Sequence, residues 1–169
     1  LSEVLGEALP GLEKMLRVFG SRQIRSRATV GGNLCNASPI GDLAPALLAL
    51  DATAVAASAA GERRVPLRDF FPSYRQTALQ PGEILAAVEV PRPPADAWFT
   101  TYKVSKRREL DISIVSAGMF LELDGPRVAA IRLAYGGVAA TPVRATRAEA
   151  ALLGQRWALR VELPKRGSD

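Results

Sequence analysis

Apolar residues recur at helical spacing in three stretches of the chain. In residues 9–20 they return every three to four positions, with Pro10 near the start and Gly20 just past the end, which predicts an amphipathic helix. Asp42 precedes the apolar run 43–50 as an N-cap residue would, so a short buried helix is expected there. Residues 144–153 return to a helical pattern near the other end of the sequence.

Between the last two helical stretches the pattern is that of strands. Residues 53–58 and 63–67 flank a turn at Gly61 and predict a hairpin. Further strands are expected over residues 84–91, 98–105, 114–123 and 128–136. Helices followed by mainly antiparallel strands, with a helix again at the end, indicate an α+β fold and not the alternating order of a doubly wound sheet.

The proline-rich run at 91–96 is the best position for a boundary within the chain. It separates residues 1–95, which hold a glycine-rich segment, from residues 96–169, which are antiparallel strands with a helix. No apolar run reaches the roughly 20 residues that a membrane span needs, so we expect no membrane partner and a cytoplasmic location. The first residues contain no signal-peptide pattern, and we expect the chain to belong to something larger.

The composition removes several classes of chemistry. The 169 residues include no His and a single Cys, Cys35, which excludes a Ser-His-Asp triad, a His-ligated zinc and a cysteine-ligated iron–sulfur cluster within this chain. We therefore assign no metal ligand, and we expect Cys35 to be a small buried hydrophobic residue. Basic residues outnumber acidic ones by 22 to 17, a net charge of +5 that permits a phosphate-bearing partner without requiring one.

Residues 29–33, Thr-Val-Gly-Gly-Asn, form the segment best suited to ligand binding. Two adjacent glycines allow positive φ and close approach of a ligand to the backbone, and Asn33, Asn36 and Ser38 add short polar groups. We expect a loop here that can cradle phosphates or sugar-like hydroxyls, although such a segment can also be only a tight connection.

Basic residues gather at two further places. The basic run 103–109 is expected to be a solvated loop tip or, alternatively, an electropositive loop beside an anionic ligand. Arginine clusters at 25–27 and 106–108 raise a nucleic-acid binder as another alternative. The sequence has none of the known aromatic or zinc-bearing modules, so no such partner is expected.

Four collinear segments resemble a known family. They read TVGGNLCNASPIGDLAPALLAL, FFPSYRQT, PGEILAAVEVP and KVSKRRELDISIVSAGM. In this order and spacing they resemble the FAD-binding domain of xanthine dehydrogenase and, more broadly, the flavin subunits of molybdenum hydroxylases, including the medium subunit of carbon monoxide dehydrogenase. The resemblance covers residues 9–157.

The resemblance implies an FAD site. Phe19 matches the aromatic residue that packs on the isoalloxazine ring, and Lys103 matches a basic residue near the polar edge of the ring. A cation there would favour the anionic reduced flavin. The remaining matches are Thr29, Gly32, Asn33 and Asn36 for the diphosphate and ribityl contacts, Gly41 and Asp42 for the same region of FAD, and Ile84 and Leu85 for apolar contacts beside the flavin.

The resemblance also implies a function in electron transfer. Electrons would pass from a molybdenum (molybdopterin) site through 2Fe-2S clusters, both on partner subunits or domains, to FAD and then to NAD+. No side chain of this chain is assigned a catalytic role. The alternative is an incomplete flavin fragment that serves as an interaction module without bound FAD.

The sequence departs from the family pattern in three respects. The upstream glycine-containing segment that holds the ADP end of FAD in the family is not expected within this chain. Gly41 stands where relatives often have Ser, which removes one hydrogen-bond donor. Leu110 stands where some relatives carry an acidic residue close to the flavin, which leaves NAD+ and oxygen both open as the electron acceptor.

Overall fold

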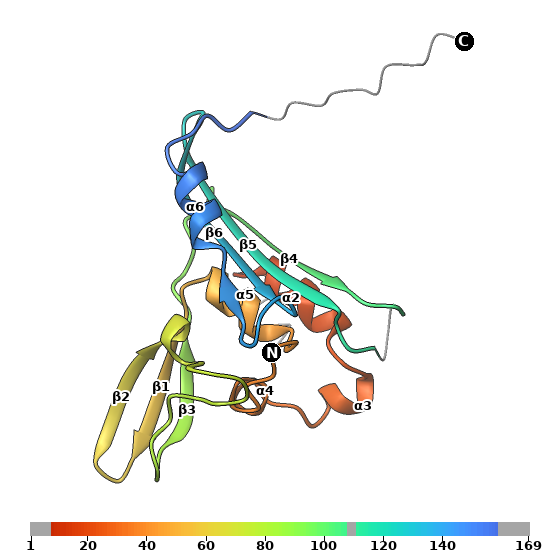
Figure 1. The fold of residues 1–169 in the computed structure, drawn as a ribbon, viewed down its shortest axis with the longest axis vertical. Helices are drawn as coiled ribbons and strands as arrows, with labels where there is room; N and C mark the ends of the chain where they lie inside the picture. Colours follow the sequence, from red (N-terminus) through yellow and green to blue (C-terminus); the bar gives the residue numbers. More distant parts are fainter. Residues whose placement is uncertain (1–7, 108–110, 159–169) are drawn as a thin grey trace.

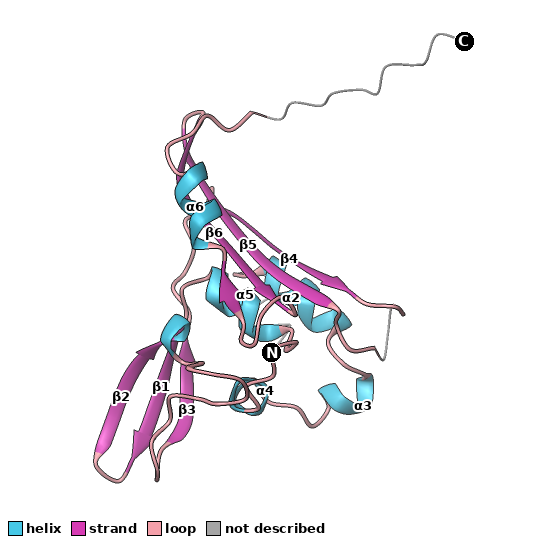
Figure 2. Cartoon of the chain, in the orientation of Figure 1, coloured by secondary structure: helices cyan, strands magenta, loops and turns pink. Residues whose placement is uncertain are grey.

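The computed structural model describes residues 8–107 and 111–158, which form two antiparallel sheets with helices packed against them (Figures 1 and 2). The α+β class predicted from the sequence is confirmed. The helices are α2 (Pro10–Val18), α3 (Arg22–Arg25), α4 (Val30–Cys35), α5 (Leu43–Ala49) and α6 (Thr146–Leu152), with a 3-10 turn at Leu67–Asp69. The strands are β1 (Thr53–Ser58), β2 (Gly61–Pro66), β3 (Ile84–Glu89), β4 (Trp98–Val104), β5 (Val115–Asp124), β6 (Arg127–Gly136) and β7 (Val143–Arg144).

The smaller sheet has the order β2-β1-β3. The predicted hairpin is confirmed: β1 pairs with β2 from Thr53↔Pro66 to Ser58↔Gly61, and Gly61 has the positive φ of +124° that its turn requires. Strand β3 pairs with the other side of β1 and is therefore an edge strand. In Figure 1 this sheet forms its own layer, apart from the larger sheet.

The larger sheet has the order β4-β5-β6-β7, and its two faces pack against different helices. Phe120 and Ala134 lie on the face that meets α2 and α5 and belong to the main core. Successive strand residues alternate between faces, so Leu121 and Ile131 point the other way and pack with Leu152 of α6 in a smaller cluster. The long strands β5 and β6 thus separate two apolar layers.

Helix α2 is joined closely to β4. A Cβ atom added to Gly11 would lie 2.7 Å from the carbonyl oxygen of Phe99, so only glycine allows this approach. The Thr101 hydroxyl donates a 2.7 Å hydrogen bond to the carbonyl oxygen of Gly11 in a buried position. The main core accordingly draws on both sides of the run 91–96, while the division into 1–95 and 96–169 stays a prediction.

Two short helices differ from the sequence-based expectation. The segment between α2 and the glycine residues, which includes Arg25, contains α3, whose N-cap Ser21 accepts a hydrogen bond from the Ile24 amide. The glycine segment is helical and is not a loop: Thr29 caps α4 by accepting a 2.9 Å bond from the Gly32 amide, and neither Gly31 nor Gly32 has a positive φ. The expectation of a loop was wrong, because a side-chain cap is sufficient to start a helix over these residues.

The aromatic pair Phe70 and Phe71 lies in the core: both are buried, and their rings meet edge to face at 5.2 Å. Cys35 is exposed, which corrects the expectation of a buried residue. Partial burial still raises the pKa of its thiol. Among the residues described, no helix is long and apolar enough to cross a bilayer.

Candidate functional site

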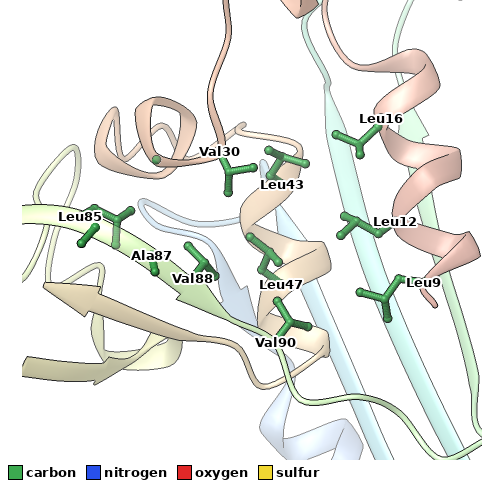
Figure 3. A pocket seen from close by; sticks show the side chains of 12 residues that line it. Leu9, Leu12, Leu16, Val30, Leu43, Leu47, Leu85, Ala87, Val88 and Val90 are labelled. Carbon is green, nitrogen blue, oxygen red and sulfur yellow. The ribbon is translucent and has the colours of Figure 1, made fainter. Parts of the chain in front are cut away.

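A groove runs between α2, the α4–α5 region and strand β3. It consists of two adjoining cavities of about 310 and 580 Å³, and both are lined by Leu16, Val30 and Leu43. The smaller cavity is aliphatic, as Figure 3 shows: leucines of α2 face Val30 and leucines of α5, with Leu85 and its β3 neighbours along one side. The larger cavity is more polar and contains the side chain of Phe19.

Phe19 is the C-cap residue of α2 and is half-buried. It lines the larger cavity together with Glu13 and Arg17, which pair at 2.6 Å, and with Arg25. An aromatic wall between charged groups suits a flat heteroaromatic ligand that carries polar edges. The structure therefore places Phe19 where a stacking residue would be useful.

The N-terminus of α4 enters the same groove through Val30. Thr29 is at the N-cap and uses its hydroxyl on the Gly32 amide, while the Val30 and Gly31 amides precede the first intrahelical hydrogen bond, from Asn33 to Thr29. A Cβ added to Gly31 would lie 3.8 Å from the Leu85 carbonyl oxygen, an ordinary van der Waals contact, so α4 and β3 approach each other closely here. These helix-start amides can receive an anionic group.

Asn33 and Gly41 lie close together behind this helix start. The Oδ1 atom of Asn33 is buried and has no hydrogen-bond partner among the residues described. A Cβ added to Gly41 would lie 3.7 Å from that oxygen and 3.3 Å from the carbonyl oxygen of Ser38. This buried acceptor has no donor among the described protein atoms, and neither Asn33 nor Gly41 lines a cavity of the groove.

Asp42 does not cap α5, although it occupies the N-cap position. Its carboxylate instead accepts a 2.7 Å bond from Lys103 Nζ on one oxygen and a bond from the Ser113 hydroxyl on the other. The Lys103 and Asp42 side chains are only 7% and 8% exposed. Lys103 also donates to the carbonyl oxygen of Val18, at 3.3 Å, next to Phe19. Lys103 is therefore a buried residue of strand β4, which corrects the expectation of a solvated loop tip for this position.

The two apolar residues expected beside the flavin are separated by strand alternation. Leu85 lines the aliphatic cavity, whereas Ile84 is 67% exposed on the edge strand and lines neither cavity of the groove. The turn before them is held by Glu83, which receives two hydrogen bonds from Arg63 and one from the Gln80 amide. These bonds lower the pKa of the Glu83 carboxyl group, with the Arg63 bond as the largest cause.

The structure brings only some of the predicted residues together. Phe19 and Leu85 share the groove, and Asp42 with Lys103 lies directly behind the end of α2. Asn36, the C-cap of α4, is exposed and lies outside both cavities. Leu110 and Arg108 lie outside the described residues.

Two residues of the site were not predicted from the sequence. Ser113 fixes one oxygen of Asp42, and Arg25 holds the C-terminal end of α2 through its side chain. The Ser113 bond joins residues 71 positions apart, and the Arg25 bond depends on how α3 folds back toward the end of α2. Within residues 8–107 and 111–158, no group of three or more Asp, Glu or Cys side chains is arranged to hold a metal ion.

The site fits an elongated cofactor with an aromatic ring and a phosphate group. The helix-start amides of α4 and the Phe19 side chain are complementary to phosphate and ring groups respectively. FAD carries both.

Two families match consecutive segments of the chain. Residues 1–93 match the FAD binding domain in molybdopterin dehydrogenase, and residues 100–162 match the CO dehydrogenase flavoprotein C-terminal domain. The chain is 39% identical over 154 residues to xanthine dehydrogenase of Emericella nidulans, covering 90% of this chain and 11% of that protein. It is 34% identical to the glyceraldehyde dehydrogenase medium chain of Sulfolobus acidocaldarius, covering 92% of this chain and 54% of the relative.

Solved structures show the same fold. Carbon monoxide dehydrogenase from Hydrogenophaga pseudoflava contains a chain that superposes with a TM-score of 0.87 at 29% identity, covering 92% of this chain and 54% of that one. The chain thus spans about half the length of the medium-chain relatives and about a tenth of the length of the xanthine dehydrogenases.

Proposed function

The chain belongs to the family of FAD-binding domains in molybdopterin dehydrogenases, and from this we propose that it binds FAD and carries electrons within a molybdenum hydroxylase. The family resemblance recognised in the sequence is confirmed by both matches and by the fold. The observation that carries the proposal is the groove with Phe19 at one end, Leu85 at the other and the start of α4 between them.

In this proposal the chain's residues bind and orient the cofactor. Phe19 packs on the isoalloxazine ring and Leu85 supplies an apolar contact beside it. The Val30 and Gly31 amides and the capped turn at Thr29 and Gly32 receive the diphosphate, because helix-start amides favour anions. Asn33, which lines neither cavity, is a proposed ribityl contact from the family resemblance. Asn36, Gly41 and Ile84 remain proposed contacts from the family resemblance.

Lys103 and Asp42 act together. Because Lys103 is already bound to Asp42 and to the Val18 carbonyl, its ammonium group is held in one place beside the end of α2. A fixed positive charge near the ring would stabilise negative charge that develops there on reduction. Bound FAD would supply the ability to take up two electrons and release them singly or as a pair.

The wider assembly belongs to the same proposal. The relatives named above include xanthine dehydrogenase and carbon monoxide dehydrogenase, and the matched family is an FAD binding domain in molybdopterin dehydrogenase. We propose partner subunits or domains that hold the molybdopterin and 2Fe-2S centres, NAD+ as the acceptor and a cytoplasmic location.

Titration of the 169-residue chain with FAD tests the proposal. We expect the wild type to bind FAD saturably, as monitored by flavin fluorescence. Gly31→Leu should weaken binding at least tenfold, because the new side chain would fill part of the aliphatic cavity that Gly31 and Leu85 line. Cys35→Leu is the matched control, since it adds bulk at an exposed position of the same helix and should leave affinity unchanged.

A flat titration of the folded wild type would refute FAD binding by this chain and favour the alternative of an interaction module. Equal affinity of the two leucine variants would refute the assignment of the groove.

A further inference from the structure

Arg25 connects the short helix α3 to the end of α2. Its Nη1 atom donates to the carbonyl oxygen of Phe19 at 2.8 Å and to that of Gly20 at 3.4 Å. These carbonyls follow the last turn of α2, where backbone acceptors lack intrahelical partners and a positive charge is favourable. Gly20 has a φ of +51°, so the chain reverses at the residue that Arg25 holds.

Arg25 also lines the larger cavity, as does Phe19. Phe19 itself has left the helix, with an extended ψ of 120°, and its amide makes only a long 3.4 Å bond back to Leu16. The helix therefore does little to fix the Phe19 backbone. The Phe19 side chain packs against the main core, and the 2.8 Å bond from Arg25 is the shorter of the two described hydrogen bonds to its backbone.

We propose that Arg25 is a positioning residue of the flavin site, which orients the Phe19 ring by holding its backbone carbonyl. The proposal rests on the proposed function, since the ring needs a fixed orientation only if it packs on a flavin. If the Phe19 ring is already ordered before FAD binds, binding costs less conformational entropy. Arg25 acts through Phe19 and is not itself assigned a contact with the reacting atoms.

Arg22 provides a matched comparison. It lies on the same four-residue helix and is exposed, but its side chain makes no hydrogen bond or ion pair with residues 8–107 or 111–158. Arg22→Gln and Arg25→Gln remove the same charge from α3. Any difference between them reports on the bonds to the end of α2 and not on net charge.

The test measures two properties in the 169-residue chain. Amide hydrogen exchange over residues 16–21 reports on the backbone without cofactor, and FAD titration with visible circular dichroism of the bound flavin reports on the ring environment. Arg25→Gln should accelerate exchange in this segment, weaken FAD binding about three- to tenfold and alter the flavin dichroism. Arg25→Lys, which retains one donor, should recover some of each effect, and Arg22→Gln should match the wild type.

The possible failures are distinct. Unchanged exchange in Arg25→Gln overturns the anchoring role. Faster exchange with wild-type FAD affinity and flavin dichroism overturns the role in positioning the ring. Absence of saturable FAD binding in the wild type refutes the proposed function, and with it the flavin role of Arg25, whatever the exchange data show.

Discussion

Replacing Gly41 with Ser should stabilise the protein by supplying the donor that Asn33 lacks. The Cβ position at Gly41 is 3.7 Å from the buried Oδ1 of Asn33, so a hydroxyl one bond further on can reach hydrogen-bonding distance. The same Cβ would lie 3.3 Å from the Ser38 carbonyl oxygen, a close contact that requires a small local shift. Gly41 does not have a positive φ, so the backbone accepts a side chain.

The magnitude follows from three contributions. A buried polar group without a partner costs about 1–3 kcal/mol, and a new hydrogen bond returns about 0.5–1.5 kcal/mol net. Loss of the glycine's freedom in the unfolded chain adds about 0.4–1 kcal/mol. The tight contact with Ser38 offsets some of this gain. We expect Gly41→Ser to raise the free energy of unfolding by about 1–2 kcal/mol, which corresponds to about 2–8 °C in Tm.

Gly41→Ala is the control, because it brings the same Cβ and the same backbone restriction without the hydroxyl. The Ser variant should exceed the Ala variant by about 1 kcal/mol in urea unfolding. In an Asn33→Leu background, which removes the acceptor, that difference should vanish. The reasoning is refuted if Ser and Ala are equally stable, or if their difference persists when Asn33 is absent.

Three further predictions concern the buried Lys103–Asp42 pair, the contact between Gly11 and β4, and the loss of stability at acidic pH. Lys103→Met leaves the Asp42 carboxylate buried without its cation and should lower the free energy of unfolding in urea by about 3–5 kcal/mol. Adding Asp42→Leu should recover most of this loss. A loss below about 1 kcal/mol would contradict the prediction. Gly11→Ala gains about 1 kcal/mol in helix propensity, but its Cβ would lie 2.7 Å from a carbonyl oxygen of β4. Calorimetry should therefore show a net loss of about 1–3 kcal/mol in stability. A rise in Tm would exclude the clash. Arg63 lowers the pKa of Glu83 below its ordinary 4.5, so the stability that the pair contributes is present above pH 4.5 and is lost as pH falls through the folded-state pKa. Arg63→Gln should therefore flatten the fall of Tm on acidification. An unchanged pH profile would show that the pair contributes nothing.

The regular elements could be predicted because their periodicity is local. The apolar repeat that ends at Gly20 and the run after Asp42 correspond to α2 and α5, and the alternating segments correspond to β1–β6 within a few residues. Helices α3 and α4 could not be predicted in this way, since they are only four and six residues long and carry few buried side chains. Their caps, Ser21 and Thr29, are signals that sequence inspection could have used.

The residue types around the candidate site could be predicted from the sequence, but the hydrogen bonds and ion pair between distant residues could not. The short polar residues and glycines of 29–42 were recognised as a ligand-binding segment, and the groove does lie beside them. The bond between Asp42 and Lys103 spans 61 positions, and that between Ser113 and Asp42 spans 71. Only the packing of α5 on the larger sheet brings these residues together, so a cap was expected where the structure has a buried ion pair.

The contact between Gly11 and Thr101 has a consequence for synthesis on the ribosome. Its partners are 90 residues apart, and at about 5–20 residues per second β4 is made roughly 5–18 seconds after α2. Until then the face of α2 that contains Gly11 lacks the strand against which it packs in the native state. Newly made chains should therefore pass through an interval in which this face is available to chaperones, and slowing translation between the two segments should lengthen it.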